Sequence, residues 1–351
     1  MRIDDLLHLA IEKQASDLHL KVPQPPVMRI QGDLVIQENL PRLTPTDLQE
    51  ILEVITSPNQ RKTFERDHEL DMSYSLSGVG RFRVNASLQR GTVALSFRPI
   101  PLTIPRLDDL GLPEVIKTLA MKSRGLVLVT GHSGSGKSTT LAAMVDYINE
   151  NRPCRIVTVE DPIEFLHRDK RSMILQRELE IDTRSFATAL KHVLRQDPDV
   201  ILVGEMRDLE TIQTVLTAAE TGHLVLATLH TVSAVQTVDR VIDVFPAHQQ
   251  PQVRLQLSAL LEGVICQTLL PRVDGKERVL AAEIMIGTPA ISNLIRDGKA
   301  YQIRSVLQTN ARFGMQTLDQ ALKTLYQKKL ITLEDALAKS NDPEELRRGL
   351  S

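Results

Sequence analysis

One loop constrains this sequence more than any other feature. Residues 131–138 spell GHSGSGKS and fit the pattern G-x-x-x-x-G-K-[ST] in full. The apolar run Leu126–Thr130 enters the loop, and a helical pattern from Ser138 to about Asn149 leaves it. Glycines let backbone amides curl around phosphate groups, and a helix N-terminus adds partial positive charge. The setting favours a nucleotide-binding phosphate loop over a glycine-rich turn without a ligand.

Individual residues of the loop have expected roles towards ATP and Mg²⁺. Lys137 should reach the β- and γ-phosphates, and the hydroxyl of Ser138 should ligate the magnesium ion. The other expected nucleotide contacts come from the loop and the first helical turn: Gly131, Ser133, Gly134, Ser135, Gly136 and Thr139.

Carboxylates follow two further strand-like runs. Ile156–Val159 leads into Glu160-Asp161-Pro162-Ile163-Glu164, and Ile201–Val203 leads into Gly204-Glu205. Ligands of open α/β sheets bind at the carboxyl ends of the strands. An acid of the first group could take a proton from an attacking water, although acids at strand ends also serve solubility. Glu205 has the form of a Walker B acid that holds Mg²⁺ through water, with Glu where Asp is usual.

Two histidines bracket a third strand-like run, Leu224–Thr228. His223 opens it and His230 follows it. A metal site would need a third ligand, and none lies near in the sequence. For His230 we favour a polar side chain that senses the γ-phosphate. His223 fits that role and the role of a satisfied structural histidine equally well.

The chain divides into three stretches by pattern. Residues 1–98 predict a mixed α/β domain, and the proline-rich residues 99–113 predict a semi-rigid linker. Residues 114–351 predict a mainly parallel sheet covered by helices, ending in a small helical bundle from about residue 287. The strands and helices that we expect most clearly are Ser16–Leu20, Val27–Ile30, Ser73–Leu76, Arg81–Leu88, Leu126–Thr130, Ile156–Val159, Val200–Val203, Leu224–Thr228, Pro289–Arg296, Met315–Gln327 and Thr332–Lys339.

Composition narrows the class of partner and the compartment. The 351 residues include 42 basic and 44 acidic side chains, and this balance argues weakly against nucleic acid. The two cysteines, Cys154 and Cys266, are far apart and read as free thiols of a reducing compartment. The acidic N-terminus does not resemble a signal peptide, and no apolar run approaches the roughly 20 residues of a membrane span. We therefore expect a cytoplasmic protein.

Taken together, these motifs resemble the secretion ATPase superfamily, and within it the PilT-like twitching-motility ATPases that retract type IV pili. The resemblance covers nearly the whole chain. It rests on long, unusual strings: ASDLHL at 15–20, GRFRVN at 80–85, the phosphate loop, EDPIE at 160–164, GEMRD at 204–208, and TGH at 221–223 with His230.

The resemblance implies a PAS-like N-terminal domain joined to a RecA-like ATPase domain, assembled as a homo-hexameric ring. By position, Glu164 matches the catalytic glutamate that activates water, and Glu205 matches the Walker B acid. Arg83 and Arg98 match arginines that close over the phosphates. The implied partners are an inner-membrane platform protein, which recruits the ring to the pilus base, and a paralogous retraction ATPase.

Two absences and one departure refine the assignment. Pilus-assembly and type II secretion ATPases usually carry a longer N-terminal region and a four-cysteine zinc motif, and neither occurs here. This favours the retraction branch. The retraction family also has a C-terminal signature, AIRNLIRE, which reads AISNLIRD at 290–297 of this chain, with Ser292 for Arg and Asp297 for Glu. The change leaves open whether the chain is the main motor or an accessory paralogue.

Three functions from other classes compete. A RecA-like DNA translocase or helicase would need a basic, aromatic-lined channel, and the chain has no Trp and 3% aromatic residues. A small-molecule kinase would need an acceptor pocket and often a mobile lid. A nucleotide-gated binding module would bind ATP without turnover, which the two intact acids Glu164 and Glu205 disfavour.

Overall fold

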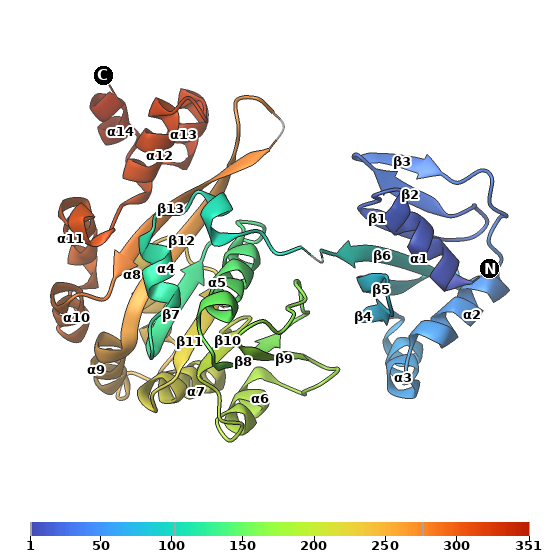
Figure 1. Ribbon diagram of the computed structural model, residues 1–351, viewed down its shortest axis with the longest axis horizontal. Coiled ribbons are helices and arrows are strands. Elements are labelled where there is room, and N and C mark those ends of the chain that lie inside the picture. Colours follow the sequence, from blue (N-terminus) through green and yellow to red (C-terminus); the bar gives the residue numbers. More distant parts are fainter. Residues whose placement is uncertain (1, 102, 276, 351) are drawn as a thin grey trace. The chain divides into compact units, whose positions relative to one another are not determined.

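The computed structural model describes residues 2–101, 103–275 and 277–350 (Figure 1). The chain forms two compact units: the first ends at Thr103 and also takes in Glu164–Leu166, and the second comprises Ile104–Ile163 and the residues from His167 onwards. Among the described residues, we find no helix with the length and hydropathy of a membrane span.

The first unit is a six-stranded antiparallel sheet with the strand order β3-β2-β1-β6-β5-β4, together with three helices. Its elements are α1 (Ile3–Glu12), β1 (Asp17–Leu20), β2 (Val27–Ile30), β3 (Asp33–Ile36), α2 (Pro45–Ile55), α3 (Pro58–Asp67), β4 (Glu69–Leu76), β5 (Gly80–Gln89) and β6 (Thr92–Ile100).

Alternating side chains explain the core of this unit. Phe82, Val84 and Ala86 of β5 are fully buried, whereas the intervening Arg83 is exposed. The sequence predicted two closing strands, but the structure has a third, β6, which pairs with β5 and extends to Ile100. The prolines after residue 98 hid this strand in the sequence, although its earlier residues alternate as a strand should.

The second unit is a seven-stranded sheet with the order β13-β12-β7-β11-β10-β8-β9, in which only β13 runs antiparallel to its neighbour. Its strands are β7 (Gly125–Thr130), β8 (Arg155–Glu160), β9 (Met173–Glu178), β10 (Val200–Val203), β11 (Leu224–Leu229), β12 (Leu261–Pro271) and β13 (Arg278–Ile286). Four of them lie within two residues of the predicted bounds; β9, β12 and β13 were not predicted.

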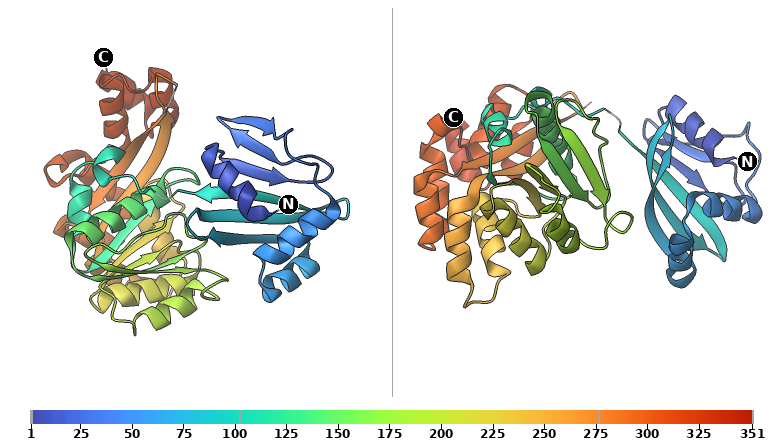
Figure 2. Two further views of the ribbon diagram at one scale, coloured as in Figure 1. Left: turned by 45° about the vertical axis from the view of Figure 1, so that its right-hand side comes forward. Right: turned by 60° about the horizontal axis from the view of Figure 1, so that its bottom comes forward.

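Helices cover both faces of this sheet (Figure 2). They are η1 (Leu107–Leu110), α4 (Val115–Ala120), α5 (Lys137–Asn151), α6 (Phe186–Val193), α7 (Leu209–Glu220), α8 (Ala234–Asp243), α9 (Gln250–Leu260), α10 (Pro289–Arg296), η2 (Ala300–Gln302), α11 (Ile303–Thr309), η3 (Ala311–Phe313), α12 (Leu318–Gln327), α13 (Leu333–Lys339) and α14 (Pro343–Leu350). The three predicted C-terminal helices are present, two of them starting later, at the residue after the N-caps Thr317 and Thr332.

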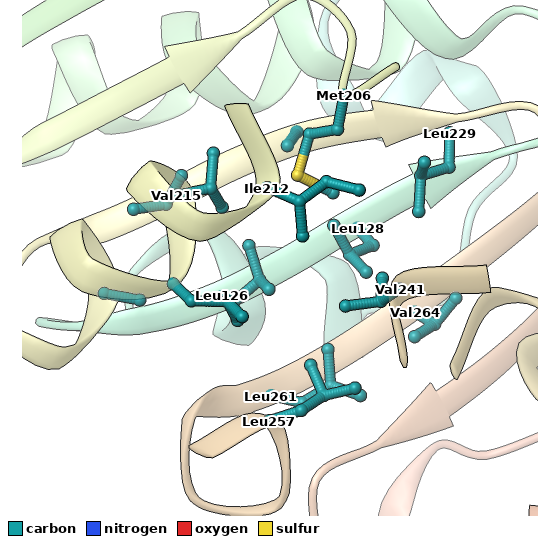
Figure 3. Close-up of a cluster of buried hydrophobic side chains, with 14 of the residues drawn as sticks. Leu126, Leu128, Met206, Ile212, Val215, Leu229, Val241, Leu257, Leu261 and Val264 are labelled. Atoms are coloured by element: carbon teal, nitrogen blue, oxygen red, sulfur yellow. The ribbon is translucent and has the colours of Figure 1, made fainter. Parts of the chain in front are cut away.

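Strand β7 shows why the sheet needs cover on both sides. Leu126 and Leu128 pack into the cluster formed with α7, α8 and α9, which Figure 3 shows, whereas Val127 and Val129 pack into the cluster formed with α4 and α5. Successive residues of a strand point to opposite faces, so a continuous apolar run fits only a sheet buried on both faces. Because β7, β8, β10 and β11 pair in parallel, their carboxyl ends lie at one edge of the sheet, where the polar segments follow them.

Candidate nucleotide site

The phosphate loop lies between β7 and α5. Lys137 is the first residue of α5, and its buried Nζ donates to the carbonyl oxygens of Gly131 (2.9 Å) and His132 (3.0 Å). Gly131 and Gly136 have φ angles of 140° and 91°, which favour glycine. A Cβ atom on Gly131 would also overlap the carbonyl oxygen of Gln267 on β12. The loop is therefore compact, and the bonds from Lys137 to its first two residues hold its ends together.

Polar groups of the loop fit a phosphate. The Oγ atom of Ser135 is buried and has no hydrogen-bond partner among the residues that the structure describes. Ser133 and Gly134 are exposed at the tip of the loop, and Ser138 and Thr139 are half-buried in the first turn of α5. A buried donor without a partner is costly, and an anionic oxygen would satisfy it. The residues present therefore fit a nucleotide phosphate group.

Glu205 follows β10 at the same edge of the sheet. Its Oε1 lies 2.7 Å from Nε of Arg207 and 3.1 Å from Nε2 of His230. Burial raises the pKa of Glu205, but the hydrogen bond from Arg207 and the charges of His230 and Arg207 outweigh it, so the pKa is lowered overall. Glu205 is therefore a carboxylate at neutral pH, and carboxylate oxygens are among the ligands that Mg²⁺ prefers.

The two histidines lie at opposite ends of β11. His230 follows the carboxyl end of the strand and contacts Glu205. His223 precedes the amino end, where its Nδ1 lies 2.9 Å from the carbonyl oxygen of Ala218 and 3.1 Å from Oγ1 of Thr221. Within this chain the structure does not bring His223 to the phosphate loop. Among the described residues, no three His, Cys, Asp or Glu side chains gather as a metal site.

The acids after β8 have different surroundings. Oε1 of Glu160 accepts from Thr158 Oγ1 (2.6 Å) and from Gln176 Nε2 (3.1 Å). Glu164 is exposed and follows Ile163, whose side chain is buried. Glu160 is thus held in place by its neighbours, whereas the carboxylate of Glu164 faces solvent.

Arg83 and Arg98 lie opposite one another on β5 and β6 of the first unit. Arg83 is exposed. Nε of Arg98 donates to Oδ1 of Asp17 at 2.8 Å, and Asp17 lies within the string ASDLHL. The guanidinium of Arg98 is therefore paired within its own unit.

Sequence reasoning assigned no role to two residues that shape this site. Arg207 lies within the GEMRD string, two residues after Glu205, so the spacing could have indicated it. Gln267 lies on the unpredicted strand β12, and its Nε2 donates to Oγ1 of Thr140 on α5 at 2.6 Å. No local signal marks Gln267, because it is brought to the loop only by the pairing of β12 with β7.

A buried strand, a glycine loop that opens a helix, and a second strand ending in a carboxylate define the class of P-loop nucleotide hydrolases. The sequence profile of the type II/IV secretion system protein family matches residues 95–337 of the chain. The chain belongs to this family.

Individual relatives narrow the assignment. The chain is 52% identical to the type IV pilus retraction ATPase PilT of Pseudomonas aeruginosa, over 98% of this chain and 99% of that protein. It is 42% identical to the type IV pilus ATPase PilU of the same organism, over 99% of this chain and 91% of that protein. A crystal structure of the pilus retraction motor PilT with bound ADP superposes with a TM-score of 0.93, at 49% identity and 99% coverage of both chains.

These findings confirm the predicted family, fold class and enzymatic class. The chain is an ATPase of the secretion family with an N-terminal α/β domain, a RecA-like domain and C-terminal helices. The roles of single residues stay predictions.

Proposed function

We propose that this chain is a motor ATPase of type IV pilus retraction, which acts as a homo-hexamer on the cytoplasmic side of the inner-membrane pilus base. The observation that carries the proposal is the likeness to PilT over nearly the full length of both chains, with every residue of the phosphate loop in place. An inner-membrane platform protein is the proposed partner, with a paralogous retraction ATPase beside it.

In this proposal the phosphate loop binds ATP. Lys137 exchanges its two carbonyl partners for β- and γ-phosphate oxygens, and the Oγ atom of Ser135 gains the partner that it lacks. Ser138 and Glu205 are the side chains that would hold Mg²⁺, which supplies charge neutralisation on the phosphates when bound. The low pKa of Glu205 suits that role, because a protonated acid would be a poor ligand.

The acid Glu164 activates the attacking water, acting as a general base. Its exposed carboxylate is free to approach a water beside the γ-phosphate. His230 senses the γ-phosphate through Glu205. Because the imidazole contacts the Glu205 carboxylate, a shift of that carboxylate on nucleotide binding would also shift His230. His223 lies at the far end of β11 from the phosphate loop. In this proposal it therefore contacts the nucleotide that is bound to a neighbouring subunit.

Arg83 and Arg98 stabilise charge on the transferring phosphoryl group. For Arg98 this requires release from Asp17, since the same guanidinium cannot hold both partners at full strength.

A second candidate is an accessory retraction ATPase. Ser292 and Asp297 on and after α10 depart from the retraction signature and favour it. The higher identity to PilT than to PilU favours the main motor.

The test is replacement of PilT in Pseudomonas aeruginosa by this chain, scored as twitching motility, alongside ATP hydrolysis and solution mass of the purified protein. We expect a six-subunit protein that hydrolyses ATP and restores twitching. The Glu164→Ala variant should bind nucleotide but should neither hydrolyse ATP nor restore twitching. A chain that hydrolyses ATP, fails to replace PilT, and restores twitching in a strain that lacks PilU would be an accessory motor. A chain that binds ATP without turnover would overturn the proposal.

A further inference from the structure

The segment that carries Glu164 leaves one strand and returns into its neighbour. We call residues 161–172, between β8 and β9, the Glu164 loop. A general base must be held within hydrogen-bond reach of its water, and a small displacement costs much of its effect. Since Glu164 is exposed, the backbone of this loop determines where its carboxylate lies.

Strand β9 holds the outgoing arm of the loop. Glu178 is buried, and its Oε2 accepts from the backbone amide of Ile163, the residue before Glu164, at 3.0 Å. Gln176 accepts from the backbone amide of His167 through Oε1 at 2.8 Å. Both bonds go to the backbone, so they fix the path of the chain on either side of Glu164.

Helix α5 holds the returning arm through surface ion pairs of Lys170 with Asp146 and Glu150 and through Asn149, which is fully buried. Its Oδ1 accepts from the backbone amides of Lys170 (3.0 Å) and Ser172 (3.3 Å), and its Nδ2 donates to the carbonyl oxygen of Arg168 (2.8 Å). A buried amide side chain without partners would be costly, and here all three bonds go to the Glu164 loop.

Asn149 thereby connects the loop to the phosphate site. Helix α5 is continuous from Lys137 to Asn151, so Asn149 lies about 18 Å along the same helix from the phosphate-binding lysine. A helix of this length is stiff, and its two ends fix two loops relative to one another. The distance between the phosphate loop and the returning arm is set by one element.

We propose that Asn149 is a positioning residue for hydrolysis: it anchors the Glu164 loop to the helix that carries the phosphate loop. The inference rests on the proposed role of Glu164 in water activation. It assigns to a buried asparagine, far from the phosphates, an effect on turnover that leaves nucleotide binding unchanged.

The first experiment compares variants of the full-length protein in steady-state ATP hydrolysis and in ADP binding. We expect Asn149→Ala to lower kcat at least tenfold while KM and the Kd for ADP stay within about twofold, because the phosphate loop is untouched. Asn149→Asp is isosteric and keeps the acceptor for the two amides, so its kcat should fall between those of Asn149→Ala and the wild type. Asn151→Ala is the matched control, since exposed Asn151 bonds through Nδ2 only to its own helix, at Tyr147 O.

The second experiment asks whether Asn149 acts through Glu164. The residual single-turnover rate of Glu164→Gln is compared with that of the double variant Asn149→Ala/Glu164→Gln. If Asn149 only positions Glu164, the second substitution costs nothing further. A purely structural role would lower the residual rate by the same factor as in the wild type.

The outcomes separate the two proposals. Wild-type kcat in both Asn149 variants, additive effects in the double variant, or a Kd for ADP that rises in step with the loss of kcat would each overturn the positioning role. If any of these results is found and Glu164→Gln has lost steady-state turnover, the positioning role of Asn149 is wrong but the proposed function still holds. Wild-type turnover by Glu164→Gln would instead overturn the role of Glu164, and the inference with it.

Discussion

The phosphate loop and the Glu164 loop leave the same edge of one sheet, yet they are fixed in different ways. The phosphate loop bonds to itself: Lys137 donates to carbonyls five and six residues before it. The Glu164 loop is held by Asn149, Gln176 and Glu178, from a helix before it and a strand after it. The first is a local structure that a short sequence specifies, and the second exists only when the tertiary fold is complete. We therefore expect damage to the first to abolish nucleotide binding and damage to the second to spare it.

The largest effect should come from Lys137→Ala. The substitution removes the charge that faces the β- and γ-phosphates and both bonds that close the loop, so kcat/KM should fall by roughly 100-fold or more. Fluorescent-nucleotide titration should show that binding is lost as well. The melting temperature without nucleotide serves as the control for folding. Binding at wild-type affinity would contradict the view that this loop and the Glu164 loop divide binding from turnover.

The same contrast explains what the sequence could reveal. The phosphate loop, Glu205 and Glu164 all lie in contiguous strings with fixed spacing after buried strands, and the sequence located each of them at a strand end. Long apolar runs such as β10 and β11 were equally clear. These features depend on neighbours in the chain, which a single sequence shows directly.

What the sequence hid depends on distant partners. Strand β9 is a half-buried edge strand with the sequence MILQRE, which lacks both a continuous apolar run and a clean alternation. Asn149 looks like an ordinary polar residue near a helix end until the Glu164 loop folds against it. Gln267 reaches α5 only because β12 pairs with β7. None of these partners is adjacent in sequence, so no local pattern predicts them.

An intermediate effect is expected on the free energy of unfolding when the pH is lowered, because His167 in the Glu164 loop is partly buried. Burial lowers the pKa of His167 to about 4 from 6.5, with Asp146 opposing the shift and Lys170 adding to it. Because the folded-state pKa lies below the unfolded one, the unfolded chain binds the proton more readily between these values. Stability present above pH 6.5 is therefore lost as the pH falls towards 4, by up to about 3 kcal/mol.

Urea unfolding at pH 7 and pH 5 measures this loss. His167→Gln cannot titrate and keeps the backbone amide that donates to Gln176, so it should lose less stability than the wild type between the two pH values. The expected difference is about 2 kcal/mol at pH 5. Equal losses of stability in the two proteins would show that protonation of His167 does not cause the loss. The packing of the Glu164 loop would then not depend on this titration.

The smallest effect should come from Lys170→Ala, which tests what kind of contact holds the Glu164 loop. Nζ of Lys170 pairs with Asp146 (2.8 Å) and Glu150 (2.9 Å) on α5, but the side chain is 39% exposed and solvent screens both pairs. The backbone amide that donates to Asn149 remains in the variant. We expect kcat to stay within about twofold of the wild type and stability to change by less than about 1 kcal/mol. If Lys170→Ala lowers kcat as far as Asn149→Ala does, surface ion pairs hold the loop, and the buried asparagine merely fills space beneath it.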